Sequence, residues 1–356
     1  MLVTKQNTYS EPQLFIGDEE IFDFSNVKLS FSNSSLNTMS VTVYQPDLDN
    51  FKLFDRPIQF YLNCGANDGV PIFRGFIKDY NAGSKNVTIK ALDPRCFMTG
   101  SQGIPIDITE TDNYDGFTVA QFLQAYITDY INVNDTVIGL NALKDIEKPP
   151  LMKSVRGTIN DVYGTIRGII DEEIDDSDLT NIKKYYVDMI DDGLYSNITF
   201  YTEQNLDDNS YPSLTLKYDD GLVDYKYKRR APPTSIIVSG TGGNEEEGGV
   251  PVVGSFNYGN SPMGRVGKAI SGKYNSVADA QQAGVVDLLQ NYDVIDELTV
   301  ISNKGYYIGL GSIVSLQVPE VEISKNFRLV GKDISFTKNS MQLTLKLSKP
   351  KLRVSF

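Results

Sequence analysis

The sequence predicts an α+β protein that is mostly β, and three observations carry this prediction. Short runs with a period of two recur over residues 1–98 and again over 196–356, and each such strand is expected to bury one face. Between these regions the apolar spacing becomes helical. The 356 residues are 40% hydrophobic, which is enough to fill sizeable cores. We therefore expect a folded chain of roughly two to four domains.

Residues 1–98 are expected to form a small barrel or sandwich. Turn residues, such as those of 67–69 and 81–84, separate runs rich in β-forming residues. The predicted strands of this region are 27–31, 41–44, 58–61, 73–77 and 87–91.

Residues 99–195 are expected to form a mixed α/β domain. Apolar residues fall at helical spacing from Phe117 to Ile131, and Thr118 with Gln121 forms a capping box at the start. A second helix is predicted over about 160–172, with Thr158 and Asp161 as its cap pair. The segment 179–190 is ambiguous and is a candidate third helix.

β character returns after residue 195, in 198–201, 214–217 and 235–238. The glycine-rich stretch 240–249 is expected to be a mobile loop. A helix from Ser276 to about Asn291, capped by Ser276 and Asp279, is expected next, and the last 60 residues again favour strands. Two β-rich units thus flank the middle and could be two copies of one module.

Charge is strongly uneven along the chain. The total is −13, from 33 Lys and Arg against 46 Asp and Glu, which argues against a duplex DNA binder. Residues 171–224 hold 15 acids and three bases (−12), whereas 325–356 hold eight bases and one acid (+7). One interpretation is two solvated faces. The other is complementary assembly surfaces, on which acid meets base in a neighbouring subunit or partner.

The absence of histidine excludes Ser-His-Asp and Cys-His catalysis and HExxH zinc sites. Cys64 and Cys96 lie outside any CxxC motif, and we expect both to be reduced and buried. No apolar run approaches about 18 residues, so no membrane span is predicted. The N-terminus lacks a basic region followed by an apolar one, so we expect no signal peptide and folding in a cytoplasm.

No group of residues satisfies the requirements of an active site. The acidic run 171–178 lacks the EF-hand glycine and glutamate spacing. Paired carboxylates lack a tryptophan to stack a sugar. Gly309-Leu310-Gly311 resembles the start of a dinucleotide fingerprint, but a strand follows it, so we predict a tight turn between strands. We therefore expect no catalytic, cofactor-binding or metal-binding residue, no cofactor and no enzyme activity, which leaves a structural or interaction protein.

Several short sequence motifs, taken in their order along the chain, resemble those of the hub proteins at the tip of phage tails and of related contractile injection systems. The first β unit carries 53–61 followed by a Phe-x-Gly-x-Ile strand at 73–77, and Ala91-Leu92-Asp93-Pro94 leaves it. The second half carries 224–228, the strand 236–238, the glycine-rich loop and an alanine-to-leucine helix from Ser276. The turn 309–314 and the strand 327–334 follow, with Ser312 where the family would have an aspartate.

The resemblance implies two tube-like small β-barrel domains in each chain. Residues 1–98 would be the first, and residues 196–239 with 296–356 would be the second. Residues 99–195 would be a peripheral α/β domain, and 240–295 an insertion with a flexible glycine-rich loop and a helix. Long siphophage relatives append a hydrolase, but this chain ends at Phe356 directly after a barrel strand, so no appended enzyme is expected.

The resemblance also implies a function, that of a structural hub. A homotrimer would form a pseudo-six-fold ring that joins the hexameric tail tube to a three-fold spike or tip protein and lets DNA pass. The expected partners are other copies of the chain, the tail tube or distal tail protein, the spike or tip protein, and the tape measure protein as a further candidate.

Neither sequence-specific nucleic-acid binding nor a membrane span is expected of such a hub, and its place would be the virion tail tip or baseplate, after assembly in the host cytoplasm. We expect an acidic channel that repels DNA. The alternatives are a distal tail or tube-initiator protein, and a tail-associated hydrolase or glycan-binding module.

Overall fold

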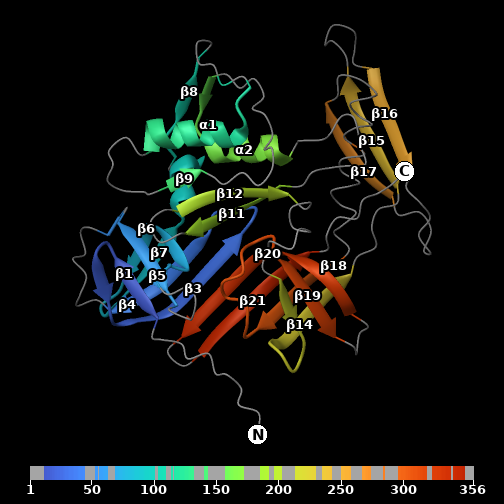
Figure 1. Cartoon of the computed structure of the whole chain (residues 1–356). Coiled ribbons are helices and arrows are strands. Elements are labelled where there is room, and N and C mark those ends of the chain that lie inside the picture. The colour runs from blue at the N-terminus through green and yellow to red at the C-terminus, as the bar shows by residue number, and fades with distance from the viewer. Residues whose placement is uncertain are drawn as a thin grey trace.

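A computed structural model of the chain describes most of the predicted elements. The described residues are 12–44, 53–54, 56–62, 69–100, 103–109, 114, 116–131, 140–142, 157–171, 185–191, 196–202, 213–229, 235–242, 250–257, 267–273, 284, 296–318, 323–337 and 340–348. The chain is mostly β, as predicted, with strands on both sides of a small helical region (Figure 1).

The strands fall into three groups along the chain. The first β unit contains β1 (Gln13–Ile16), β2 (Glu19–Ile21), β3 (Phe24–Ser32), β4 (Thr38–Tyr44), β5 (Pro57–Tyr61), β6 (Phe73–Ala82) and β7 (Asn86–Leu92). The middle contains β8 (Ile106–Ile108), β9 (Leu140–Ala142), β10 (Gly157–Ile159), β11 (Tyr185–Asp191) and β12 (Ser196–Thr202). After these come β13 (Leu214–Leu216), β14 (Leu222–Arg229), β15 (Ser235–Gly242), β16 (Val250–Asn257), β17 (Gly267–Lys273), β18 (Asp296–Ser302), β19 (Ile313–Val318), β20 (Ile323–Thr337) and β21 (Ser340–Ser348).

One 13-stranded sheet contains both β units. Its strands follow the order β14-β18-β21-β20-β3-β4-β7-β6-β5-β1-β2, with β19 pairing β20 and β13 pairing β19. We call β13, β14 and β18–β21 the second β unit. In Figure 1 the blue strands of the first unit lie beside the orange and red strands of the second. Among the described strands no pairing closes either unit into a barrel.

The two units share a hydrophobic core because their strands alternate in the way the sequence predicts. Val27, Leu29 and Phe31 of β3 are buried, and Lys28 and Ser30 between them face the other side of the sheet. One cluster of buried side chains runs from β1 through to β21. The outer face of the sheet is consequently polar.

Five strands of each unit follow the same order. The order is β3-β4-β7-β6-β5 in the first unit and β14-β18-β21-β20-β19 in the second. Each copy also has a β-bulge at the same place, between Ile77 and Asp79 where β6 pairs β7, and between Leu329 and Gly331 where β20 pairs β21. The suggestion that two copies of one module flank the middle agrees with this topology.

The middle region packs two helices over its own core. Helix α1 (Val119–Tyr126) begins at the predicted capping box of Thr118 and Gln121 and continues as a π-helical turn, η5 (Ile127–Ile131). Helix α2 (Val162–Asp171) begins after Asp161, whose Oδ1 accepts from the Gly164 backbone N–H at 2.8 Å. Their apolar faces pack with β8, β10 and the short 3-10 helix η3 (Pro94–Met98) into a second core.

Two predicted helical features differ from the structure. Thr158 does not cap α2; it lies in β10, and its hydroxyl donates to Asp107. The candidate third helix is wrong for its second half, because residues 185–191 form β11, paired antiparallel with β12. The predicted helix from Ser276 to Asn291 lies outside the described residues, apart from Gly284.

Two strands expected in the second β unit belong to other sheets. Residues 196–202 form β12, which pairs with β11 and β9 in the middle region. Residues 235–242 form β15, which pairs with β16 and β17 in a separate three-stranded sheet. The first residues of the predicted glycine-rich loop therefore extend β15, and the remaining 243–249 lie outside the described residues.

Candidate functional site

The strand junction between β20 and β3 joins the two β units. β20 pairs with β19 along its first half and with β3 along its second half, from Gly331 opposite Ser32 to Phe336 opposite Val27. On the polar face the Ser30 hydroxyl donates to Asp333 Oδ1 at 2.5 Å. Lys346 Nζ lies 2.7 Å from the other oxygen of Asp333. The junction is thus held by backbone pairing across the sheet and by polar contacts on its outer face.

A shallow hollow of about 410 Å³ lies on this polar face. It crosses β20, β3, β4 and β7, so both units contribute to it. Its polar lining consists of Lys28, Ser30, Thr38, Ser40, Lys90, Asp333 and Ser335. Lys90 also pairs with Asp79 at 3.2 Å, with both side chains mostly exposed. These residues offer exposed charges and hydroxyls but no buried nucleophile or acid–base pair.

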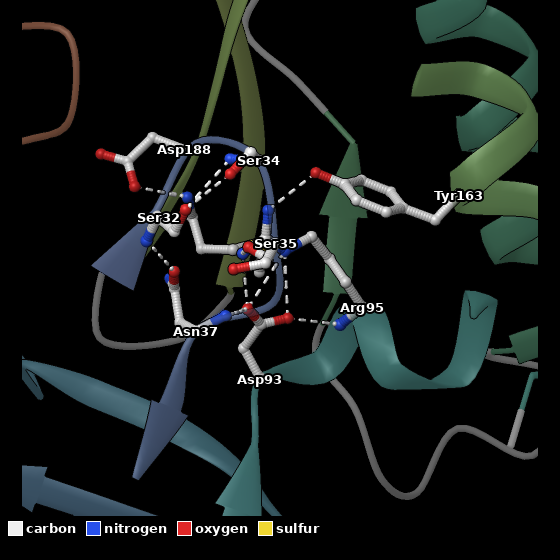
Figure 2. Close-up of polar contacts among 9 residues, drawn as sticks. Ser32, Ser34, Ser35, Asn37, Asp93, Arg95, Tyr163 and Asp188 are labelled. Atoms are coloured by element: carbon white, nitrogen blue, oxygen red, sulfur yellow. Dashed lines mark hydrogen bonds and ion pairs between the residues drawn. The ribbon is translucent and has the colours of Figure 1, made fainter. Parts of the chain in front are cut away.

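A buried ion pair fixes the first β unit to the middle region (Figure 2). Asp93 follows β7 and caps η3, and Arg95 Nη2 lies 2.6 Å from its Oδ2. The same oxygen accepts from the Asn37 backbone N–H at 2.6 Å. Arg95 Nη1 donates to the Tyr163 hydroxyl of α2 at 2.8 Å, and Nη2 donates to the Ser35 carbonyl at 3.4 Å. One arginine therefore connects the β3–β4 turn, the end of β7 and helix α2.

Arg95 stays charged in this site. Burial alone would lower the pKa of its guanidinium, but the Asp93 carboxylate and the Tyr163 hydroxyl outweigh burial and raise the pKa above its ordinary value. Arg95 is fully buried and Asp93 is 2% exposed, so the pair is shielded from salt and solvent. The function of this pair is structural, because both groups are fully engaged.

A buried lysine fixes the turn before β19. Lys332 of β20 is 6% exposed, and its Nζ donates to the carbonyl oxygens of Tyr306 and Ile308, at 2.8 and 3.0 Å. The ammonium also lies 4.7 Å from the centre of the Phe31 ring of β3. Lys332 thus contacts both β units from inside the sheet.

A buried aspartate holds the same turn from the middle region. Asp188 of β11 accepts from the backbone N–H of Leu310 at 2.8 Å through Oδ2, and from that of Met189 at 2.8 Å through Oδ1. It makes no direct ion pair with Lys332 among the described contacts. The two opposite charges are instead connected through the backbone of the 306–310 turn.

Burial shifts both of these groups toward neutrality. Burial raises the pKa of Asp188, and the charge of Lys332, the Leu310 N–H, the charge of Arg95 and the Met189 N–H oppose this in that order. Burial lowers the pKa of Lys332 to about 8, and the charge of Asp188 opposes this. The two carbonyl hydrogen bonds and the Phe31 ring support the charged form of the lysine.

These two residues come from the oppositely charged stretches of the sequence. Asp188 belongs to the acidic stretch 171–224 and Lys332 to the basic stretch 325–356. Two members of the oppositely charged stretches are therefore buried inside one chain. Neither interpretation of these stretches, as solvated faces or as surfaces that meet a neighbouring subunit or partner, predicted this. Arg328, another base of the second stretch, is also buried.

Cys96 is buried and free, as expected, and Cys64 lies outside the described residues. Gly309-Leu310-Gly311 is a turn between β18 and β19, as predicted, and Gly311 has φ +83°.

In the part of the chain that the structure describes, no three acidic or cysteine side chains are grouped to hold a metal ion. Residues 172–178 of the acidic run lie outside that part, and no described helix is long and apolar enough to cross a membrane.

No protein-family model and no curated protein matches the chain. Solved structures do match over nearly its whole length. A tail protein from Neisseria meningitidis MC58 has a TM-score of 0.63 at 12% identity, covering 96% of this chain and 97% of the other. The 43 kDa tail protein of prophage MuSo2 from Shewanella oneidensis has a TM-score of 0.63 at 9% identity, covering 97% and 100%.

An E. coli component of the type VI secretion system is also similar, with a TM-score of 0.56 at 13% identity, covering 96% of this chain and 78% of the other. That protein is itself described as structurally similar to the T4 phage tail proteins gp27 and gp5. The chain therefore has the fold of phage tail proteins and of related type VI secretion proteins. The resemblance drawn from the sequence is confirmed at the level of the fold.

Proposed function

We propose that this chain is a structural hub at the tip of a viral tail. The observation that carries the proposal is the repeated five-strand module, present twice in one chain and joined side by side through β20 and β3. Three copies of a chain with two equivalent modules present six modules around an axis. Such a ring matches a six-fold tube on one side and a three-fold spike or tip protein on the other.

The polar face of the continuous sheet is the proposed wall of the channel through which DNA passes. Four of the eleven residues that line the hollow on this face carry a hydroxyl group, and its charges are mixed. The described charges on this face include four lysines, Lys28, Lys90, Lys226 and Lys346, against three aspartates, Asp79, Asp224 and Asp333. These seven charges are not acidic in sum, so they give no support to the expected acidic channel. A wall of short polar side chains with few clustered bases would still bind DNA weakly.

The same assembly would determine the partners of the chain and its location. The partners would be other copies of the chain, the tail tube or distal tail protein, the spike or tip protein, and the tape measure protein as a further candidate. The chain would act in the virion tail tip, after assembly in the host cytoplasm, and would not be an enzyme. Peptidoglycan turnover or glycan binding by the purified chain would instead favour the tail-associated hydrolase or glycan-binding alternative.

Native mass spectrometry of the purified protein tests the proposal. One chain weighs 39.6 kDa, so a trimer is expected at three times this mass, about 119 kDa. A hexamer of about 238 kDa, six times 39.6 kDa, would favour the distal tail or tube-initiator alternative. A protein that remains monomeric at every concentration would contradict the hub.

A further inference from the structure

The repeated module shows which strands of the two units are equivalent. β6 corresponds to β20 and β3 corresponds to β14, because each pair holds the same place in the shared strand order. A backbone bond supports the match: Ile77 N–H donates to the Arg56 carbonyl at 3.0 Å, and Leu329 N–H donates to the Ser312 carbonyl at 3.0 Å. Each bond lies directly beside the bulge of its strand.

The register of the two modules can be aligned residue by residue across four strands. Directly opposed residues form one row in each module, at the position that follows the bulge. The row in β6-β7-β4-β3 is Asp79, Lys90, Ser40 and Lys28, and the row in β20-β21-β18-β14 is Gly331, Lys346, Thr299 and Lys226. A lysine at the second position, a hydroxyl at the third and a lysine at the fourth recur in both rows.

The junction inside the chain uses one of the two possible strands in each module. β20 of the second unit pairs with β3 of the first. The equivalent strands that would make the same junction again are β6 of the first unit and β14 of the second. β5 stays beside β6 only as far as Phe76, just as β19 stays beside β20 only as far as Arg328. β14 is the end strand of the described sheet.

We propose that β6 of one copy pairs antiparallel with β14 of a second copy of this chain, repeating between copies the β20–β3 junction. This inference rests on the proposed ring and adds which residues of β6 and β14 lie opposite each other between copies. Transferring the pairs Lys332–Phe31, Asp333–Ser30 and Ile334–Leu29 to the equivalent strands gives the intermolecular pairs. These are Tyr80 with Arg229, Asn81 with Lys228, and Ala82 with Tyr227.

Exposure supports this pairing. Ile334 and Leu29, which are opposite each other in the internal junction, are 1% and 2% exposed. Their equivalents in a single chain are not covered: Ala82 is exposed and Tyr227 is 36% exposed.

The geometry of the contact also limits the assembly. β6 and β14 are different surfaces of the chain, so the contact is heterologous and each copy can use both surfaces at once. Such contacts generate either a closed ring or an open filament. A closed ring of three copies repeats the module six times, with three internal and three intermolecular junctions.

Cysteine crosslinking of the full chain tests the register, in a background that carries Cys64→Ser. Directly opposed residues lie about 4.5–5.5 Å apart between Cα atoms, which suits a disulfide. Asn81→Cys with Lys228→Cys should therefore give crosslinked dimers and trimers after mild oxidation. The internal control is Ser30→Cys with Asp333→Cys, the equivalent pair, which should crosslink within one chain. The slipped control is Asn81→Cys with Lys226→Cys, two residues out of register.

The outcomes separate this inference from the proposed function. Intermolecular crosslinks in the Asn81–Lys228 variant, absent from each single-cysteine variant and at least about tenfold weaker in the slipped control, would support it. A trimer by native mass without Asn81–Lys228 crosslinks would overturn the inference and leave the hub standing. A variant series that stays monomeric together with the parent would overturn both.

Discussion

The two β units follow one strand order but are filled and anchored differently. Gly75 of β6 and Phe327 of β20 hold the same place, since Gly75 pairs with Ile58 where Phe327 pairs with Val314. The first unit is anchored to the middle region by a direct buried ion pair, whereas the second is anchored by separated charges that hold a turn. One module can therefore be repeated within a chain while each copy acquires its own attachment.

Breaking the buried Asp93–Arg95 ion pair should cause the largest loss of stability. Replacing Asp93 by alanine leaves the Arg95 charge buried without its carboxylate, and the Asn37 N–H without its acceptor. We expect a loss of about 3–5 kcal/mol in the free energy of unfolding, measured by urea denaturation. The double variant Asp93→Ala with Arg95→Met should recover part of this loss, because it removes the unpaired charge. A double variant as unstable as the single one would contradict this explanation.

A disturbance of the packing around Gly75 in the first unit should cause the second-largest loss of stability. A Cβ at Gly75 would lie 2.3 Å from the Leu92 backbone oxygen, so Gly75→Ala should cost about 3 kcal/mol through overpacking. This explains the glycine of the Phe-x-Gly-x-Ile strand. The matched control is Gly168→Ala on α2, where a Cβ meets nothing within 4 Å and a helix favours alanine. Equal melting temperatures for the two variants would contradict the steric argument.

Removing the Lys332 contacts that anchor the second unit should cause a smaller loss of stability. Lys332→Met leaves the carbonyls of Tyr306 and Ile308 without their donor, and we expect a loss of about 2–3 kcal/mol by denaturation. Amide exchange should rise in the 306–310 turn before it rises in β3. Uniform exchange across both units would show that Lys332 does not act on the turn.

The burial of Lys332 also predicts that the stability of the protein depends on pH. The folded-state pKa of Lys332 is about 8, below the roughly 10.4 of an unfolded chain. Between these values the unfolded chain binds more protons, so the free energy of unfolding rises with pH. From pH 8 to pH 10 the wild type should gain about 1–2 kcal/mol relative to Lys332→Met. A relative loss over this interval would contradict the assignment.

Local patterning predicted most individual elements. All five strands predicted in the first unit are present, and the Thr118–Gln121 capping box fixes the start of α1. These features depend on neighbours in sequence, which is why one sequence suffices. The sequence leaves residues 179–190 ambiguous because Tyr185–Asp191 satisfies helical and strand spacing alike, and only the pairing of β11 with β12 decides between them.

The anchors could not be predicted because they depend on a bulge and on distant contacts. With strict alternation, the buried Phe327 and Leu329 would place Lys332 on the solvent side. The bulge between Leu329 and Gly331 reverses the alternation, so Lys332 points inward with Ile334. The one local signal at the other anchor is Asp93-Pro94, which is typical of a helix start.

Electron-microscopy class averages of the purified protein test the central claim most directly. If one chain contributes two equivalent modules and three chains close through β6 and β14, end views should show a closed ring. The ring should have six lobes of similar size and three-fold symmetry, with the middle regions as three further densities. Monomers without rings, or rings whose lobes do not number two per chain by native mass, would contradict the account.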